Sequence, residues 1–248
     1  MSACNCSSNG DAGRRLFLKT GLSLAALGGV AFSGASSALS LGAISLTRQT
    51  RDSLTPDQIV DLLMKGNERF RLGKPKGHQY LEQKKATAAG QYPAAMILSC
   101  IDSRAPAEII LDAGIGEVFN ARVAGNIINE DMLGSMEFAC ELAGAKVVLV
   151  LGHTACGAVK GAIDGAELEN LTGLLQKIEP AVAATRYEGE RTSRNAAFVD
   201  EVARTNVRMT INDIRQSSRT LSALEERGSI KLVGGLYHLA GGRVELLD

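Results

Sequence analysis

The sequence predicts an α/β fold with a mostly parallel central β-sheet flanked by helices and preceded by an N-terminal helical arm. Short apolar runs, such as Ala94–Ser99 and Lys146–Leu151, have the length of buried strands. Longer amphipathic patterns lie between these runs, and strands that alternate with helices are typical of a parallel sheet. The composition is ordinary for a globular protein, with 45% hydrophobic and 22% charged residues.

The arm is expected to contain two helices, over Pro56–Leu72 and Tyr80–Ala89. Thr55 is a suitable N-cap, and Pro56 suits the first helical position because it lacks an N–H group. Apolar residues then recur at helical spacing. Residues 39–53 are expected to be a linker, so that the folded domain spans residues 54–248.

The rest of the domain alternates between the two kinds of element. Strands are expected over Ala94–Ser99, Glu117–Ala121, Lys146–Leu151, Ile230–Leu239 and Arg243–Leu247. Helices are expected over Pro106–Leu111, Glu130–Leu142, a segment beginning near Cys156, Glu169–Tyr187 and Asn195–Glu226. The Gly241-Gly242 pair separates the last two strands and predicts that they form a hairpin.

Residues 1–38 have the features of an export signal. Arg14-Arg15, followed by Phe17-Leu18-Lys19, resembles the twin-arginine motif. An uncharged run begins at Gly21, and Ser36-Ser37-Ala38 supplies small residues for cleavage. We therefore expect export by the twin-arginine machinery to the periplasm or an equivalent compartment. An uncleaved leader that anchors the chain in the membrane and a general secretory signal are the alternatives.

Charge and cysteine content exclude two classes of protein. The 27 basic and 27 acidic residues balance, so no basic footprint indicates nucleic acid as a partner. The five cysteines are an odd number, and Cys4 and Cys6 lie in the leader, which does not suit a disulfide framework. Cys140 lies among apolar helix residues and is expected to be an inert core thiol.

Three potential zinc ligands follow two of the predicted strands. Cys100 comes directly after the first strand, and His153 and Cys156 follow Lys146–Leu151. Carboxyl ends of parallel strands meet at one edge of a sheet, where ligands bind. For either cysteine alone, an ordinary buried thiol is the favoured interpretation. Together with the histidine they form a Cys₂His set with one open position, as in catalytic zinc sites, and predict one Zn²⁺ per chain.

Asp102 and Arg104 lie beside the first of these ligands. A carboxylate at Asp102 could accept a hydrogen bond from zinc-bound water or hydroxide, and Arg104 could keep it ionised and oriented. The alternative is that Asp102-Ser103 caps the helix near Pro106 and that Arg104 is a solvated charge. The spacing alone favours neither interpretation.

The motif Cys100-x-Asp102-Ser103-Arg104, followed by Gly152-His153-Thr154-x-Cys156-Gly157, resembles the β-class carbonic anhydrases. The resemblance extends over about Leu54–Asp248. It implies the β-carbonic anhydrase fold, zinc ligation by the two cysteines and His153, and a catalytic Asp102–Arg104 dyad. The implied activity is reversible hydration of CO₂ to bicarbonate and a proton by zinc-bound hydroxide. A homodimer or higher homo-oligomer is also implied, because the site of this family forms at a dimer interface.

Finer features are similar to the plant-like branch of the family. The resemblance assigns Gln91, Phe119 and Gly157 to substrate binding. Phe138 stands where that branch has a tyrosine, so the tyrosine hydroxyl is missing. The branch regulated by bicarbonate has a tryptophan near the first strand and a valine after the dyad arginine, whereas this chain has no tryptophan and has Ala105.

Two other functions remain open from the sequence. A related zinc hydrolase could act on carbonyl sulfide or carbon disulfide, and a catalytically silent protein could bind zinc alone. Two histidines lie outside the ligand set. His78 is in a Lys- and Gly-rich loop, where we expect a solvated side chain or a proton shuttle. His238 is expected to be a hydrogen-bonded structural residue.

Overall fold

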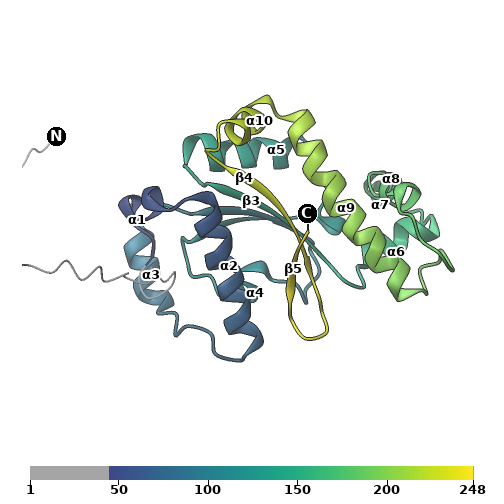
Figure 1. Cartoon of the computed structure of the whole chain (residues 1–248), viewed down its shortest axis with the longest axis horizontal. Coiled ribbons are helices and arrows are strands. Elements are labelled where there is room, and N and C mark those ends of the chain that lie inside the picture. The colour runs from purple at the N-terminus through teal and green to yellow at the C-terminus, as the bar shows by residue number, and fades with distance from the viewer. Residues whose placement is uncertain (1–44, 248) are drawn as a thin grey trace, which may run out of the picture. The chain divides into compact units, whose positions relative to one another are not determined.

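The computed structural model describes residues 45–247, so the predicted export signal lies outside the described residues (Figure 1). The helices of this part are α1 (Arg48–Ser53), α2 (Pro56–Arg71), α3 (Tyr80–Thr87), α4 (Ala107–Ile110), η1 (Ala124–Asn126), α5 (Glu130–Glu137), η2 (Phe138–Leu142), α6 (Gly157–Asp164), α7 (Glu169–Leu175), α8 (Glu179–Ala184), α9 (Ala196–Ser217) and α10 (Arg219–Glu226). The strands are β1 (Ala95–Ser99), β2 (Val118–Arg122), β3 (Val147–His153), β4 (Lys231–Tyr237) and β5 (Val244–Leu247).

The strands form one sheet in the order β2-β1-β3-β4-β5. All pairs are parallel except β4 with β5, which is the predicted hairpin. Ser99 at the end of β1 pairs with Arg122 on one side and Leu151 on the other. The register therefore brings the carboxyl ends of three neighbouring strands to the same edge.

Side chains alternate between the two faces of the sheet, and each face carries its own core. Ile97 and Leu149 pack with residues of α2 and α4 on one face. Met96 and Leu98, in contrast, pack with residues of α5 and α9 on the other. Figure 1 shows these two helical layers with the sheet between them. The mostly parallel α/β sheet flanked by helices is therefore confirmed.

The predicted arm is present as α2 and α3. Thr55 and Gln58 form a reciprocal capping box at the start of α2. The structure differs from the predicted linker over residues 39–53, because residues 48–53 form the helix α1. Thr47 caps α1, and Arg51 is buried and donates a hydrogen bond to the Ala143 carbonyl. This long-range contact holds the segment against the domain.

The two longest predicted helices are each divided. Glu169–Tyr187 becomes α7 and α8, because Pro180 lacks an N–H group and fits only the first turn of a new helix. Asn195–Glu226 becomes α9 and α10, because the Ser218 side chain accepts a hydrogen bond from Leu221 N–H and starts a second helix.

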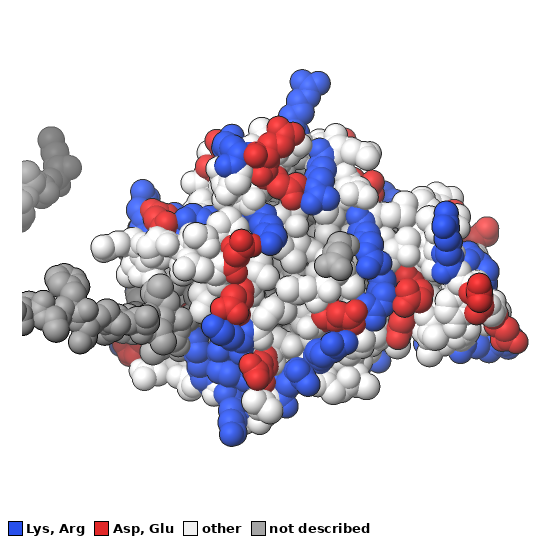
Figure 2. Space-filling view, viewed as in Figure 1, with Lys and Arg blue, Asp and Glu red and all other residues white. Residues whose placement is uncertain are grey.

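The surface shows no charge segregation on the face drawn in Figure 2, where Lys and Arg side chains lie among Asp and Glu side chains. Among residues 45–247, no helix combines the length and apolar character needed to cross a membrane.

Candidate active site

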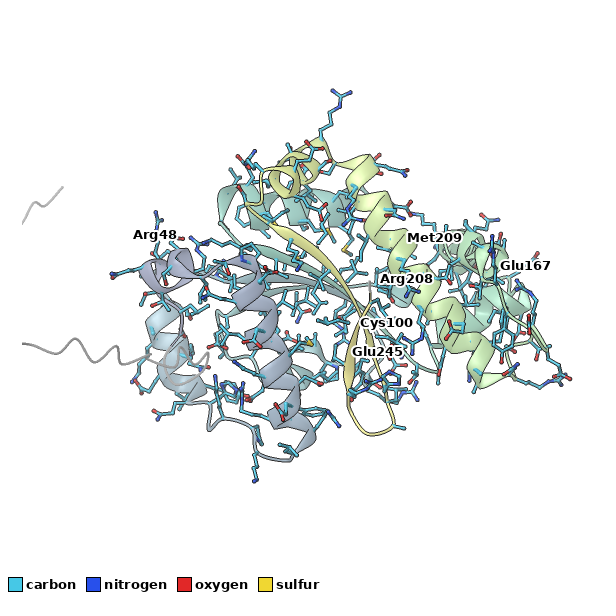
Figure 3. The ribbon with its side chains drawn as sticks, viewed as in Figure 1. Arg48, Cys100, Glu167, Arg208, Met209 and Glu245 are labelled. Atoms are coloured by element: carbon cyan, nitrogen blue, oxygen red, sulfur yellow. The ribbon has the colours of Figure 1, made fainter. Side chains whose placement is uncertain are left out.

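The three predicted zinc ligands come together at the carboxyl edge of the sheet. Cys100 follows β1 and is labelled in Figure 3, His153 ends β3, and Cys156 is the N-cap of α6. Their ligand atoms all lie within 4.8 Å of one another. Each residue is at most 3% exposed. This group could hold one metal ion in a protein-enclosed site.

His153 is already in the tautomer that a metal requires. Its Nδ1 lies 3.0 Å from the Thr154 carbonyl oxygen, which can only accept, so Nδ1–H donates this bond. Its Nε2 is buried and has no hydrogen-bond partner among the described residues. A buried nitrogen without a partner is costly unless something binds it. The residues therefore fit a zinc ion held by two sulfurs and one nitrogen.

The two cysteines influence each other's protonation. The hydrogen bond from the Cys156 thiol lowers the pKa of Cys100 to about 4. The same interaction, together with burial, raises the pKa of Cys156 even though it lies at a helix N-terminus. Burial opposes a charged His153, but the interactions with Cys100, with the Thr154 carbonyl and with Asp102 together outweigh burial and raise the pKa of His153. A metal must displace protons to bind this group.

Asp102 and Arg104 form a bidentate pair beside the ligand group. Arg104 Nε lies 2.9 Å from Asp102 Oδ1, and Arg104 Nη2 lies 2.7 Å from Asp102 Oδ2. The Arg104 backbone N–H also donates to Oδ1. These bonds hold the pKa of Asp102 far below its usual value, so the carboxylate is ionised. Oδ2 lies 3.8 Å from His153 Nε2 and therefore faces the ligand group.

Arg122 is a site residue that the sequence analysis did not assign to a role. Its guanidinium donates to the carbonyl oxygens of Cys100 and Asp102, at 2.9 and 2.6 Å. It thereby holds the loop that carries the first ligand and the carboxylate. The sequence signal that could have indicated this role is the position of Arg122, a charged residue at the end of a strand that neighbours the strand before Cys100.

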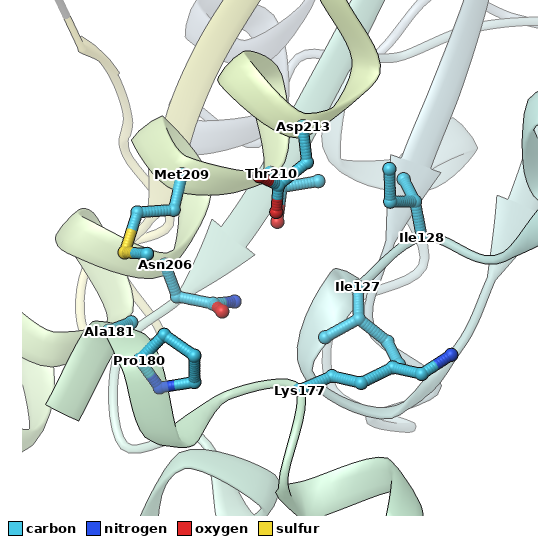
Figure 4. Close-up of a pocket in the computed structure, with 9 residues that line it drawn as sticks. All are labelled: Ile127, Ile128, Lys177, Pro180, Ala181, Asn206, Met209, Thr210 and Asp213. Carbon is cyan, nitrogen blue, oxygen red and sulfur yellow. The ribbon is translucent and has the colours of Figure 1, made fainter. Parts of the chain in front are cut away.

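The η1 segment supports the Cys100 sulfur from a third direction. Gly125 N–H donates to Cys100 Sγ at 3.4 Å, and Gly125 has a φ of 70°. The Asn206 amide in turn donates to the Gly125 carbonyl at 2.8 Å. Asn206 lines a cavity of about 280 Å³ between α8, α9 and the segment that follows η1, into which Thr210 and Asp213 also point (Figure 4). None of the predicted site residues lines this cavity.

The three predicted substrate-binding residues are placed differently from one another. Gly157 is exposed at the start of α6, and no atom lies within 4 Å of the position that a Cβ would occupy. Gln91 is exposed before β1, whereas Cys100 follows that strand. Phe119 pairs with Met96 and contacts Phe138 edge to face, at 6.3 Å between ring centroids. Of these three residues, only Gly157 therefore lies next to the ligand group of its own chain.

The remaining histidines and Cys140 have structural surroundings. The expectation of a solvated His78 was wrong: its side chain is 5% exposed and lies 2.8 Å from Asp112. The buried Asp112 carboxylate, which also pairs with Arg69, draws this histidine inward. His238 is hydrogen-bonded to Glu245 as expected. Cys140 is buried, and burial raises its pKa to about 12, as expected of an inert thiol.

Comparisons with known proteins agree with this geometry. A family model described as carbonic anhydrase matches residues 95–244. Carbonic anhydrase 2 of Mycobacterium tuberculosis is 37% identical over 192 residues, which cover 75% of this chain and 90% of that protein. The carbonic anhydrase of Mycolicibacterium smegmatis is 35% identical over 190 residues, with coverage of 74% and 89%.

Solved structures have the same fold. The β-carbonic anhydrase CafA of Aspergillus fumigatus matches with a TM-score of 0.59 and 29% identity, covering 68% of this chain and 82% of that one. A tetrameric β-carbonic anhydrase of Sordaria macrospora matches with a TM-score of 0.59 and 25% identity, covering 77% and 97%. The chain therefore belongs to the β class of the carbonic anhydrase family.

Proposed function

We propose that this protein catalyses the reversible hydration of CO₂ to bicarbonate and a proton, with one Zn²⁺ held by Cys100, His153 and Cys156. The observation that carries the proposal is the bare, buried Nε2 of His153 within 4.8 Å of both sulfurs. An ionised carboxylate faces the same group from 3.8 Å. A merely structural zinc site would need a fourth protein ligand rather than this Asp102–Arg104 pair.

When bound at this site, zinc would act as a Lewis acid that makes water a nucleophile near neutral pH. In our proposal Asp102 orients that water. Arg104 donates two hydrogen bonds to Oδ1 and one to Oδ2, and Oδ2, which faces the ligand group, would accept the hydrogen bond from the water with its remaining lone pair. Because an ionised carboxylate only accepts, Asp102 would receive a proton of this water in a hydrogen bond and so leave a lone pair of its oxygen free to face the substrate carbon.

Gly157 is proposed to leave room for CO₂ and bicarbonate. A Cβ at this position would meet no atom within 4 Å, so the space above the first turn of α6 is open. The N–H groups at the start of a helix favour negative charge, which develops on the oxygens of the substrate as bicarbonate forms.

The activity is tested by stopped-flow CO₂ hydration with the zinc-loaded protein. We expect rapid hydration that is lost with the metal and restored by Zn²⁺. Hydrolysis of carbonyl sulfide or carbon disulfide without CO₂ hydration would contradict the proposal in favour of the related hydrolase. Zinc binding without any turnover would leave a silent zinc protein.

We further propose a homodimer, or a higher assembly of such dimers, in which each site receives Gln91 and Phe119 from the partner subunit. At about 3.3 Å per residue, β1 alone separates Gln91 from Cys100 by roughly 13 Å. Phe119 lies level with Met96, four residues before Cys100, and on the edge strand of the sheet. Both side chains are therefore too far along the sheet to contact the ligand group of their own chain.

A hollow beside the edge strand supports the same proposal. It measures about 570 Å³, and Phe119 and Phe138 line it. Phe138 is 52% exposed although it is a large aromatic residue. We also propose that the chain belongs to the plant-like branch, which Ala105 and the absence of tryptophan support, although Phe138 stands in place of the tyrosine of that branch.

Complementation between two inactive variants tests the shared site. A Cys100→Ala chain lacks the metal but keeps Gln91, whereas a Gln91→Ala chain keeps the metal. If the site is shared, a mixed dimer of these two chains contains one intact site. We expect differently tagged, co-purified mixed dimers to be more active than the average of the two parents. Activity at or below that average would show that each site is built from one chain.

We also propose that the protein is exported in folded form by the twin-arginine machinery to the periplasm or an equivalent compartment. Arg14-Arg15 and the uncharged run that follows support this route. Membrane association is expected only if the leader remains uncleaved. Replacing both arginines by lysine should retain the precursor in the cytoplasm, and unchanged fractionation would refute the route.

A further inference from the structure

The turn between His153 and Cys156 is held by a side chain from a distant helix. The backbone N–H of Ala155 donates to Asp200 Oδ1 at 2.8 Å. Asp200 lies in the second turn of α9, 45 residues later in the sequence. This bond is therefore a tertiary contact that reaches into the segment joining two of the three ligands.

Ala155 is in a conformation that its side chain disfavours. Its φ is 54°, in the left-handed region where a residue with a Cβ is destabilised relative to glycine. A rotation at Ala155 would change the direction in which Cys156 leaves the turn. The turn therefore needs a stabilising contact at this residue to hold both ligands in place.

The two sides of the turn are anchored elsewhere. Thr154 N–H donates to the Tyr237 carbonyl at 3.0 Å, and Thr154 Oγ1 accepts from Leu239 N–H at 3.0 Å. These bonds tie the His153 side to β4 and the segment after it. Cys156 begins α6, and its carbonyl accepts from Lys160 N–H. Asp200 holds the middle, between these two anchors.

Asp200 is itself supported as a charged acceptor. Arg204, four residues further along α9, lies near enough to interact electrostatically with Asp200. Arg204 is in turn fixed by a bidentate pair with Glu245 of β5, at 2.6 and 3.0 Å. Figure 3 labels Glu245, which lies on β5, and Arg208, which lies on α9.

We propose that Asp200 is a positioning residue for the metal site. It stabilises the left-handed conformation of Ala155 and so sets the relative placement of the His153 and Cys156 ligand atoms. The inference rests on the proposed function only in taking this group to hold zinc. Outer partners that orient ligands commonly contribute 10–100-fold to metal affinity.

The test measures zinc affinity by competition with a chelator, and the absorption spectrum of the Co²⁺-substituted protein, for four single variants and for the double variant of Asp200→Ala with Ala155→Gly. Asp200→Ala removes the acceptor, and Asp200→Asn keeps an acceptor oxygen without the charge. Asp213→Ala is the matched control, because Asp213 is an exposed residue of the same helix whose side chain makes no hydrogen bond or ion pair with residues 45–247. Ala155→Gly removes the steric cost of the left-handed conformation.

We expect Asp200→Ala to weaken zinc binding about 10–100-fold and to shift the cobalt spectrum, while Asp200→Asn and Asp213→Ala stay within about threefold of the wild type. We also expect Asp200→Ala to cost less in the Ala155→Gly background, because glycine adopts this φ without help.

Wild-type zinc affinity and cobalt spectrum in Asp200→Ala would overturn the inference. A lower melting temperature with unchanged affinity would also overturn it, by showing a merely structural role. If the wild-type protein bound no zinc, the proposed function itself would fail, which is a separate outcome.

Discussion

Replacing Arg104 by alanine separates catalysis from folding. Of the three hydrogen bonds that Asp102 receives from this residue, the variant loses the two from the guanidinium and keeps the one from the backbone N–H. The Arg104 side chain is 56% exposed, and exposed ion pairs contribute little to stability. We therefore expect the melting temperature to stay within about 2–4 °C of the wild type.

Turnover should fall much further. Without its guanidinium, Asp102 is an unpaired anion whose Oδ2 lies 3.8 Å from His153 Nε2, beside the metal position. Coulomb attraction at this range in a partly buried site is large. We expect the carboxylate to turn onto the metal and block access of water. Removing one preorganised electrostatic group commonly lowers kcat about 10²–10³-fold, and we expect a loss of that order.

The assay combines stopped-flow CO₂ hydration, zinc content and thermal unfolding. Arg227→Ala is the matched control, because Arg227 is 54% exposed and its ion pair with Glu141 lies at the surface. We expect this control to retain turnover and zinc. Near wild-type turnover in Arg104→Ala would refute the reasoning by showing that the pair is only structural. Loss of zinc would refute it differently, by showing that the arginine supports the fold.

A variant in which any one of the three predicted metal ligands is changed to alanine should lose most of its zinc by metal analysis, because the two remaining ligands hold the ion poorly. The control Cys140→Ala removes a buried thiol outside the ligand group and should keep about one zinc per chain. Arg122→Ala loses two hydrogen bonds from a charged donor to the loop of Cys100. We expect it to lower the free energy of unfolding by roughly 3 kcal/mol in denaturant titrations, and wild-type stability would contradict this. Arg204 and His238 lower the pKa of Glu245 from 4.5 to about 2, so the stabilisation is present above pH 4.5 and is lost as the pH falls toward 2. Glu245→Gln should thus be less stable than the wild type at pH 7, with the difference closing between about pH 4.5 and 2, and a difference independent of pH would exclude this origin.

Elements that depend on short-range patterns could be predicted from the sequence. The apolar runs that became β1 and β3 are buried along their whole length, so their hydrophobicity alone located them. Cys100 follows β1, His153 ends β3 and Cys156 lies three residues further on, and parallel pairing then brings them to one edge. The ligand group was therefore implicit in two short motifs and one general rule of α/β sheets.

Elements that depend on distant partners could not be predicted in this way. Residues 48–53 have the composition of a linker, and long-range hydrogen bonds hold α1 in place, from Arg51 to the Ala143 carbonyl and from Lys146 to the Asp52 carbonyl. His78 lies in a polar loop, yet the buried Asp112 draws it out of solvent. In each case the partner is more than 30 residues away in the sequence.

The sequence by itself determined the alternation of strands and helices and the two motifs that carry the ligands, because each strand, helix and motif is encoded within a few consecutive residues, and the resemblance of these motifs to a family predicted the Asp102–Arg104 pair. Only the tertiary structure decided that Arg122 holds the Cys100 loop and that Asp200 holds Ala155. The physical reason is that these bonds join a side chain to the backbone of another element. Any residue supplies a backbone N–H or carbonyl, proline N–H excepted, so no sequence pattern marks the partner. Register and helix packing alone bring the two groups into contact.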